Sequence, residues 1–427
     1  MASSASLVHA SRCINSPPRF FSNRNASQAS PSSFACCSSS CLKEVLKVRA
    51  FNANAMTTPV RENFPWPRSL GIMNEPDHLL VLVHGILAGP NDWNYVQAEL
   101  KKRLGRNFLI YASSCNTYTK TFSGIDGSGK RLAEEVKEVV QKNDNLTKIS
   151  FLAHSLGGLI ARYAVSLLYA ESVSKNQQET SVEDSSKHGS ISGLEPQYFI
   201  TLATPHLGVR GKKQLPFLLG IPLLERLAVP VAPLLVGRTG RQLFLTDGLP
   251  ERRPLLLRMA SDCDDGKFIS SLGSFKCRCA YANVSYDHMV GWRTSSIRRE
   301  NELVVPPQRS LDGYKHVVEI EYCPPILSGD ATFPPEAAKA KEVAQSEPTS
   351  ENTEYHEILE EEMIRGLQQL GWMKVDVSFH SALWPFFAHN NIHVKNEWFH
   401  NAGAGVISHV ADTLKRHDTA PFFSARL

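Results

Sequence analysis

The stretch Phe151-Leu-Ala-His-Ser-Leu-Gly-Gly-Leu159 decides how the rest of the chain is interpreted. An apolar run typical of a strand ends at Ser155, and apolar residues then recur with helical spacing: Leu156, Leu159, Ile160, Tyr163, Ala164, Leu167 and Leu168. A strand, a tight turn that carries a serine, and a helix form the context of a nucleophile elbow. Such a turn is strained and brings two backbones together, so its neighbours must be small, as Ala153 and Gly157 are. The alternative is a serine that only caps a helix.

Length and composition limit the number of domains and the classes of partner to be expected. The 427 residues can form one large domain or two medium ones, and 42% of them are apolar, which is enough for a core. The formal net charge of +4 does not indicate a nucleic-acid partner. No apolar run approaches the roughly 20 residues that cross a bilayer. We therefore expect a protein that is soluble or peripheral to a membrane.

Residues 1–50 differ in composition from everything that follows. They are rich in Ser and Ala, contain Arg and Lys, and have no acidic residue before Glu44. This composition is typical of an organellar transit peptide and unlike a secretory signal, which needs an apolar central region. We expect import into the chloroplast; if the segment is only a disordered tail, the alternative location is the cytoplasm. Residues 51–76 are predicted to form a linker that leads into a domain spanning 77–417.

Strand and helix patterns alternate through that domain. Strands are predicted at 78–83, 108–112, 148–154, 198–203, 277–285 and 373–379. Helices are predicted at 92–104, 156–168, 130–141, 255–272, 355–370 and 406–414. This alternation predicts a mostly parallel central sheet with helices on both faces, and an alternating run at 317–322 predicts an extra strand at one edge.

Three segments interrupt the alternation. Residues 171–192 are polar and predict a surface loop, and residues 329–352 predict a flexible acidic connection. Within residues 212–250, the stretch 214–236 is rich in Leu, Val and Pro and has basic neighbours. Such a stretch can form a lid or cap that contacts a membrane, or a pair of core helices packed on the sheet; both interpretations remain open.

A serine hydroxyl becomes a nucleophile only when a base removes its proton and a carboxylate orients that base. In α/β-hydrolases these groups follow the serine in the order acid, then histidine, on loops after later strands. Asp287 follows a predicted strand, with Asp262 or Asp264 as alternative acids. Several histidines follow the last strand: His380, His389, His393 and His400. The order of residues therefore permits a Ser–Asp–His arrangement.

Backbone N–H groups must stabilise the oxyanion of such a reaction. The residue after the nucleophile, Leu156, is one candidate donor. The other is expected in the loop after the first core strand, His84-Gly85-Ile86, where Ile86 is the first choice and Leu87 the second.

Four blocks carry a resemblance to a known family: His84-Gly-Ile86, Ala153-His-Ser-Leu-Gly-Gly158, Ala203-Thr-Pro-His206 and Ala388-His-Asn-Asn-Ile392. They resemble the putative serine esterase family of lipase-like α/β-hydrolases over about residues 77 to 413. The resemblance implies that Ser155 is the nucleophile, Asp287 the orienting acid and His389 the base, with His380 the next choice for the base. Ala153 stands where the elbow pattern has its first glycine. His84, His154 and His206 are expected near the site but outside it, with His154 pointing away from Ser155 along its strand.

Two other motifs are weaker. Gly124-Ile-Asp-Gly-Ser-Gly129-Lys130 matches a phosphate-binding loop, but Arg131 follows where magnesium binding needs Ser or Thr. We interpret it as a flexible loop and helix start. Cys277-Arg-Cys279 places two thiols on one face of a strand, without the second ligand pair that zinc needs. No metal and no cofactor is expected.

These observations predict a serine hydrolase that cleaves carboxylic esters of acyl lipids through an acyl-enzyme on Ser155. A lipid acyltransferase on the same scaffold is an alternative, and so is a hydrolase-fold binding or receptor module with little turnover. The expected partners are an acyl lipid or another ester, and a membrane surface contacted through residues 214–236. No nucleic acid is expected.

Overall fold

The computed structural model describes residues 75–171, 189–210, 222–249, 251–326 and 353–415. All of them belong to one compact unit that begins at Leu70. The predicted transit peptide, nearly all of the linker, the acidic connection and most of the polar loop lie outside the described residues. Within the described ranges, no helix is both long enough and apolar enough to span a bilayer.

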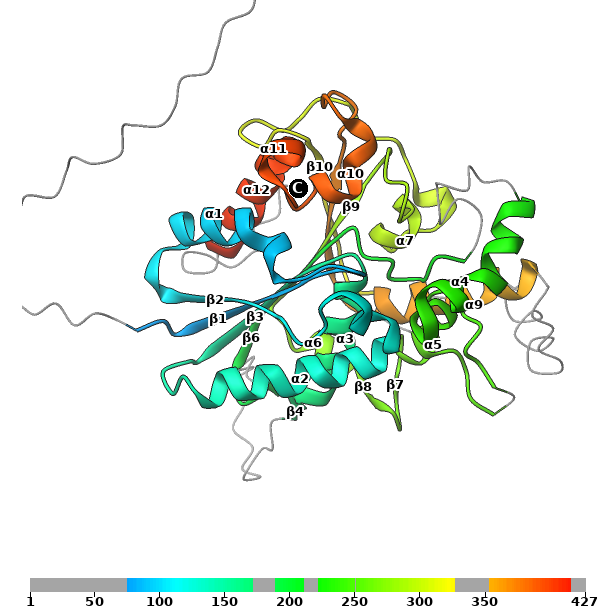
Figure 1. Ribbon diagram of the computed structural model, residues 1–427, viewed down its shortest axis with the longest axis horizontal. Helices are drawn as coiled ribbons and strands as arrows, with labels where there is room; N and C mark the ends of the chain where they lie inside the picture. The colour runs from blue at the N-terminus through cyan, green and yellow to red at the C-terminus, as the bar shows by residue number, and fades with distance from the viewer. Residues whose placement is uncertain (1–74, 172–188, 211–221, 250, 327–352, 416–427) are drawn as a thin grey trace, which may run out of the picture. The chain divides into compact units, whose positions relative to one another are not determined.

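A seven-stranded sheet forms the centre of this unit (Figure 1). Its strands are β1 His78–Val83, β2 Phe108–Ala112, β3 Lys148–His154, β6 Glu195–Leu202, β9 Cys277–Asn283, β10 Val317–Cys323 and β11 Trp372–Val377. Their order across the sheet is β10-β11-β9-β6-β3-β1-β2. Every pair is parallel except β10 and β11, which are antiparallel at one edge. The predicted parallel sheet and its extra edge strand are confirmed.

Helices cover both faces of the sheet (Figure 1). They are α1 Asn94–Leu104 and α12 Ala404–Lys415 on one face, and α2 Ile125–Gln141, α3 Leu156–Leu168 and α9 Thr353–Gln368 on the other. Strand β1 shows why both faces are buried, because successive side chains point to opposite sides. Leu79 and Val81 join the core under α2 and α3, and Leu80 and Leu82 join the core under α1 and α12.

The strand order reverses between β1 and β3. From β1 the chain goes to the edge strand β2, returns to β3 on the other side of β1, and then continues outward through β6, β9 and β11. Loops that leave β1 and β3 therefore diverge and leave a crevice at the carboxyl ends of these strands. Ser155 follows β3 and the His84–Gly89 loop follows β1, so both lie at this crevice.

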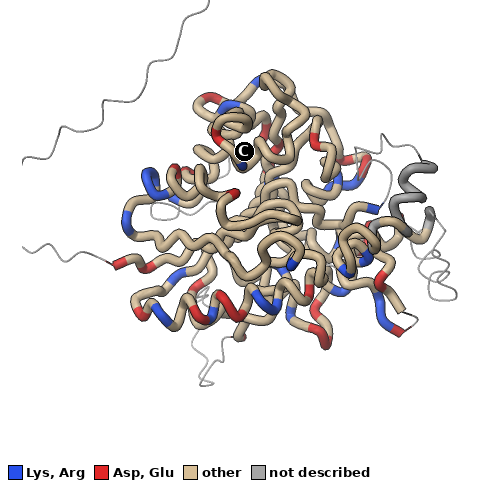
Figure 2. The backbone as a smooth tube through the Cα atoms, viewed as in Figure 1, with Lys and Arg blue, Asp and Glu red and all other residues tan. Residues whose placement is uncertain are grey.

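The glycine-rich segment 124–130 is a helix start, as the sequence predicts, but it does not form a loop, because all of it after Gly124 belongs to helix α2. Helix α2 begins at Ile125, directly after Gly124, whose φ is +99°. Instead of a strand, a 3-10 helix at Tyr118–Ser123 precedes it. A Cβ at Gly129 would lie 2.6 Å from the Tyr163 ring, so this glycine allows α2 to pack against α3. Helix α2 contains residues of both signs of charge along its length (Figure 2).

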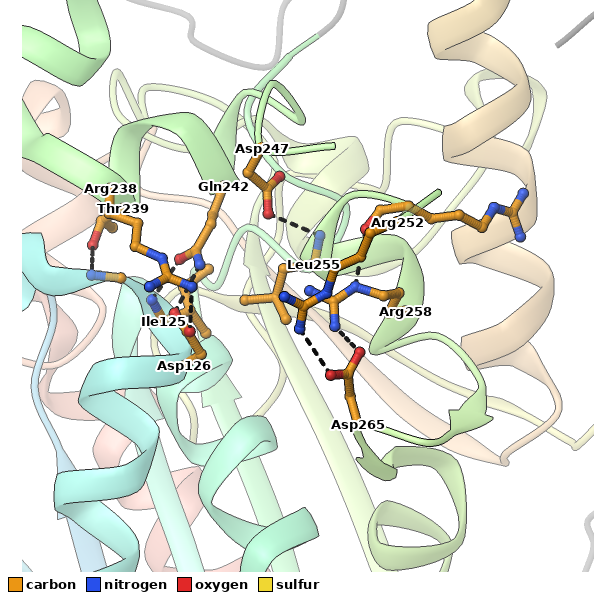
Figure 3. A network of polar contacts seen from close by, with 12 residues as sticks. Ile125, Asp126, Arg238, Thr239, Gln242, Asp247, Arg252, Leu255, Arg258 and Asp265 are labelled. Atoms are coloured by element: carbon orange, nitrogen blue, oxygen red, sulfur yellow. Dashed lines mark hydrogen bonds and ion pairs between the residues drawn. The ribbon is translucent and has the colours of Figure 1, made fainter. Parts of the chain in front are cut away.

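The prediction of one helix at 255–272 is wrong. The structure has two short helices with a hairpin between them: α5 Leu255–Arg258, β7 Asp262–Cys263, β8 Gly266–Lys267 and α6 Phe268–Gly273. Gly266 has a φ of +157°, which favours glycine in the turn, and Asp265 pairs with Arg258 across it (Figure 3). Asp262 accepts hydrogen bonds from the first N–H groups of α6 and so restarts the helix.

The end of the predicted polar loop is also a strand. β5, Ser190–Ile191, pairs with β4, Tyr169–Ala170, and Ile191 is buried. The apolar side chain of Ile191 in an otherwise polar stretch explains the pairing.

Helix α4, Pro222–Leu243, makes up most of the described part of the lid or cap predicted at 212–250, of which residues 212–221 and 250 lie outside the described ranges. Val236 and Gly237 have non-helical angles and divide the helix in two. Before this kink, Leu234 and Leu235 are exposed, whereas Thr239 beyond it is buried.

The second half of α4 is anchored to the start of α2 (Figure 3). The bonds run from the Gly124 N–H to Thr239 Oγ1 (3.0 Å), from the Ile125 N–H to Gln242 Oε1 (2.6 Å), from Arg238 to Asp126 (2.5 Å) and from Gln242 Nε2 to Asp126 (2.8 Å). The part of α4 after the kink is therefore packed as a core element.

Replacing Gly129 with Ala is expected to lower the free energy of unfolding by about 1–3 kcal/mol, because the new methyl overlaps the Tyr163 ring. Gly127→Ala is the matched control, two residues earlier in the same helix. Its Cβ would meet Ser123 Oγ at 3.4 Å, so this variant should be neutral or more stable by up to about 1 kcal/mol. Chemical denaturation of both variants checks this; equal stabilities would contradict the packing role of Gly129.

Candidate active site

Ser155 has a backbone conformation that few residues other than glycine adopt. It lies between β3 and α3 with φ 55° and ψ −130°. Its N–H donates to the Leu202 carbonyl, and its own carbonyl accepts from Thr204 Oγ1, both at 2.9 Å. Neighbouring strand β6 and the residues after it therefore hold the strained turn in place. This is the strand–turn–helix geometry of a nucleophile elbow.

Gly157 explains why the turn needs a glycine on its helical side. A Cβ at this position would lie 2.3 Å from the Val83 carbonyl oxygen and 2.6 Å from that of His84. Both contacts are with backbone, which cannot move without displacing β1. The first turn of α3 therefore lies directly against the end of β1.

The structure brings Ser155, His389 and Asp287 together. His389 lies in the short helix α10, Ala388–Asn391, and its Nε2 is 3.0 Å from Ser155 Oγ. Its Nδ1 is 3.0 Å from Asp287 Oδ2. A carboxylate can only accept, so Nδ1 carries the proton and Nε2 is free to accept the serine hydroxyl proton. This is the arrangement of a Ser–His–Asp triad.

Asp287 is buried and fully engaged. Its Oδ1 accepts from the Met289 and Val290 N–H groups, and its Oδ2 accepts from Asn283 Nδ2. Burial tends to raise the pKa of this carboxyl, but His389 and the hydrogen-bond donors outweigh burial and hold the pKa below its ordinary value. The carboxylate is therefore ionised at neutral pH. Asn283 was not identified from the sequence, where a buried asparagine at a strand end gives no distinctive signal.

The loop after β1 lies against the nucleophile. A Cβ at Gly85 would be 2.9 Å from Ser155 Cβ. The Leu87 N–H already donates to Thr121 Oγ1 at 3.2 Å, which leaves Ile86 as the better candidate donor in this loop. Leu156, the first residue of α3, provides an N–H at a helix N-terminus, where amides lack an intrahelical partner.

His84 orients the Ile86 amide. Its Nδ1 is 3.0 Å from the Gly85 carbonyl oxygen, and a carbonyl can only accept, so Nδ1 donates. Burial lowers the pKa of His84, which favours the neutral ring. In a planar trans peptide the Gly85 C=O and the Ile86 N–H point in opposite directions, so fixing one fixes the other.

His154 contacts the backbone of the candidate base. Its Nε2 is 2.8 Å from the His389 carbonyl oxygen and must donate to it. Its ring stacks on His393 with centroids 3.8 Å apart, and His393 in turn meets Trp93 edge to face. Burial holds the pKa of His154 and of His393 well below the ordinary value, so both rings are neutral. Consecutive residues, His154 and Ser155, thus bind the backbone and the ring of His389.

The other candidate residues have different partners. These are the Tyr286 hydroxyl for His380, the Asn396 N–H for His400, the Thr201 hydroxyl for His206 and the first amides of α6 for Asp262. None of these contacts involves Ser155. His389 and Asp287 are therefore the histidine and the acid that the structure brings to the serine.

The two cysteines of the motif Cys277-Arg-Cys279 lie as their spacing predicts. Cys277 and Cys279 share one face of β9, with their sulfurs 3.5 Å apart, and both are buried free thiols. Across the part of the chain that the structure describes, no three His, Cys, Asp or Glu side chains gather as metal ligands would.

A mostly parallel sheet, a strained serine after its third strand and a histidine and an acid from later loops define an α/β-hydrolase with a Ser–His–Asp arrangement. The chain belongs to the family described as "Putative serine esterase", which matches residues 73–297. Sequence and geometry therefore agree on the class of protein.

Two relatives of this chain are described as putative lipases. A putative lipase of Schizosaccharomyces pombe is 29% identical over 230 residues, 52% of this chain and 26% of that protein. One of Saccharomyces cerevisiae is 28% identical over 229 residues, 53% of this chain and 31% of that protein. The chain thus spans less than a third of the length of these relatives. Among solved structures, the propeptide form of Bacillus licheniformis lipase BlEst2 is 15% identical with a TM-score of 0.30, over 49% of this chain and 36% of that one. The family match therefore places this chain among the putative serine esterases.

His393→Phe is expected to make the fold less sensitive to acid. In the folded chain the pKa of His393 lies well below 6.5, so only the unfolded chain takes up this proton as the pH falls. The wild type therefore loses about 1.4 kcal/mol of unfolding free energy per pH unit below 6.5 because of this histidine, and nothing above 6.5. Phe keeps a ring against His154 and Trp93 and does not titrate.

Urea denaturation at pH 8, 6 and 5 checks this. Between pH 8 and pH 5 the free energy of unfolding should fall less in the variant than in the wild type. Parallel pH dependences would show that His393 is protonated in the fold.

Proposed function

We propose that this protein is a serine hydrolase that cleaves carboxylic esters of acyl lipids through an acyl-enzyme on Ser155. The observation that carries the proposal is the pair of 3.0 Å contacts that join Ser155 Oγ to His389 and His389 to Asp287. A helix-capping serine has no need of a buried histidine and carboxylate aligned in this way.

In the first half of the reaction, Ser155 Oγ attacks the ester carbonyl carbon as its proton passes to His389 Nε2. The carbonyl oxygen becomes an oxyanion that faces the N–H groups of Ile86 and Leu156. His389 then gives the proton to the leaving alcohol oxygen, the carbon–oxygen bond breaks, and the acyl group remains on Ser155. Asp287 stabilises the imidazolium that exists between these two transfers.

In the second half, water takes the place of the alcohol. His389 removes a proton from the water as its oxygen attacks the acyl carbon. Collapse of the second tetrahedral intermediate releases the carboxylic acid and returns the proton to Ser155 Oγ. All proton transfers use one imidazole, and no metal or cofactor takes part.

An acyl-lipid substrate is supported by the family and by the printed names of the relatives, which describe lipases. It is also supported by exposed apolar side chains on the loops of the site. Leu87 belongs to the loop after β1, and Met289 lies two residues after Asp287. An acyl chain gains contacts there that a polar substrate would not.

A fluorophosphonate probe tests the nucleophile and the base. The wild type should be labelled, and Ser155→Ala should not be. His389→Gln should be labelled at least about a thousand-fold more slowly, because the hydroxyl loses its proton acceptor.

His380→Gln is the matched control for the base. His380 is exposed and contacts Tyr286, so its replacement should leave the labelling rate within about two-fold of wild type. Labelling of Ser155→Ala, or a greater loss in His380→Gln than in His389→Gln, would overturn the assignment.

His154 is expected to position the base without touching the substrate. His154→Phe keeps the ring stacked on His393 but removes the donor to the His389 carbonyl, so kcat should fall by about ten- to a hundred-fold with little change in KM. His154→Gln restores an N–H donor without the ring and should recover part of the lost kcat. Equal kcat values in Phe and Gln variants would show that only the packing matters.

A further inference from the structure

The exposed tryptophan and phenylalanine side chains of the described residues all lie in one stretch, 384–399. We call this surface the aromatic rim; it consists of Leu383, Trp384, Phe386, Phe387, Trp398 and Phe399. Leu383 is 86% exposed and Trp398 is 82% exposed, so these side chains project almost completely into solvent. Scattered exposed apolar residues are ordinary, but a concentration of large ones marks a contact surface.

Four members of the rim are connected through ring contacts, and the rim rests on an ordered backbone. Ring contacts connect Trp384 to Phe387 and Trp398 to Phe399, and His400 lies between the two pairs. Asn391 Nδ2 donates to the Trp384 carbonyl at 3.1 Å. The Asn396 side chain caps the helix Glu397–His400 by accepting from the Trp398 and Phe399 N–H groups. The backbone is therefore held by hydrogen bonds while the side chains face outward.

The rim lies on the same loops as the proposed catalytic residues. His389 follows Phe387 after one residue. On the other side of the rim, the Phe386 ring contacts the rings of Tyr286 and His288, which flank Asp287. Any surface that brings an ester to Ser155 must therefore approach the carboxyl ends of the strands, which is where the rim also lies.

The first half of the rim, Leu383 to Phe387, lies in a stretch without charged residues. From Val377 to Val394 the sequence contains no Asp, Glu, Lys or Arg. Asp376, before this stretch, pairs with Arg298, and Lys395, after it, pairs with Asp92. Glu397, directly before Trp398, is exposed to solvent. Insertion of Leu383, Trp384, Phe386 and Phe387 into an apolar phase would thus require no charged group in their own stretch to leave water, whereas Glu397 would have to stay at the level of the head groups. The cation nearest to the rim in sequence, Lys395, is already paired, so anionic head groups would add little attraction.

We propose that the aromatic rim is the surface by which this protein docks on a layer of uncharged or zwitterionic acyl lipid. Tryptophan and phenylalanine favour the boundary between head groups and acyl chains, where one side of the ring is wet and the other apolar. The proposal rests on the proposed ester hydrolysis at Ser155, which requires the substrate layer to lie over this edge. It also differs from the lid expectation for residues 214–236, whose basic neighbours would favour anionic lipid.

The test uses the full chain and two double variants. Leu383→Ser/Trp398→Ser changes the two most exposed members of the rim. Leu234→Ser/Leu235→Ser is the matched control, because these leucines are 84% and 68% exposed on helix α4. Thermal unfolding midpoints first establish that both variants are folded.

Flotation with phosphatidylcholine vesicles then measures binding. The wild type and the α4 variant should bind equally, and the rim variant should bind at least about ten-fold more weakly. Addition of phosphatidylglycerol should change wild-type binding by less than about two-fold. The proposal is overturned if the wild type does not bind, if the α4 variant loses binding and the rim variant does not, or if anionic lipid raises binding ten-fold.

Two further readouts separate this proposal from others. The ratio of the rate on a vesicle-borne ester to the rate on dissolved p-nitrophenyl butyrate should fall about ten-fold in the rim variant. A wild type that binds vesicles through the rim but is not labelled by fluorophosphonate would refute the hydrolase and keep the docking surface. A wild-type dimer that the rim variant converts to monomer, with vesicle binding unchanged, would identify the rim as a protein interface and overturn the proposal.

Discussion

Helix α3 meets strand β1 at Gly157 without room for a side chain. A Cβ there would lie 2.3 Å from the Val83 carbonyl oxygen, and the Gly85 backbone on the next loop nearly touches Ser155 Cβ. These contacts make the nucleophile and the candidate oxyanion loop parts of one rigid unit. Because the strand order reverses between β1 and β3, this unit also sits where the sheet opens a crevice. The acid and the histidine are brought to this unit from later strands.

Several residues just beyond the carboxyl ends of the strands have unfavourable backbone conformations. Leu87, Ser155, Ala203 and Tyr286 all have positive φ, and each follows shortly after a strand of the sheet, β1, β3, β6 and β9 respectively. Such residues persist only where neighbouring structure over-determines them. The same region buries several histidines in the neutral form, which makes its stability depend on pH. The strained residues and buried histidines therefore lower the free energy of unfolding. The apolar cores on the two faces of the sheet compensate for this loss.

The alternation of strands and helices could be predicted from sequence because both faces of the sheet are buried and the runs are long. The hairpin at 262–267 could not, because apolar residues on both sides continue a helical spacing through a turn that depends on Gly266. In the segment 124–130 the motif indicated glycine for a loop, whereas Gly129 is required by the Tyr163 ring of a helix 34 positions later in the sequence. Local patterns identify elements, but they do not reveal which partner a glycine accommodates.

The candidate base shows the same limit and its physical reason. Chain order placed four histidines after the last strand, and His380 follows that strand most directly, yet it ends exposed beside Tyr286. His389 reaches Ser155, 234 residues earlier, because Ala388 and Ile392 are buried in the core under α1 and α12 and anchor helix α10 there.

Side chains alternate along β3, so His154 points to the same face of the sheet as Leu152, the face covered by α1 and α12. There His154 meets the backbone of α10, while Ser155 at the turn meets the imidazole of His389. The sheet therefore presents two consecutive residues to two different parts of one histidine. No sequence spacing encodes this arrangement. It follows from which face α10 packs on, and that depends on apolar residues on either side of the histidine and not on the histidine itself.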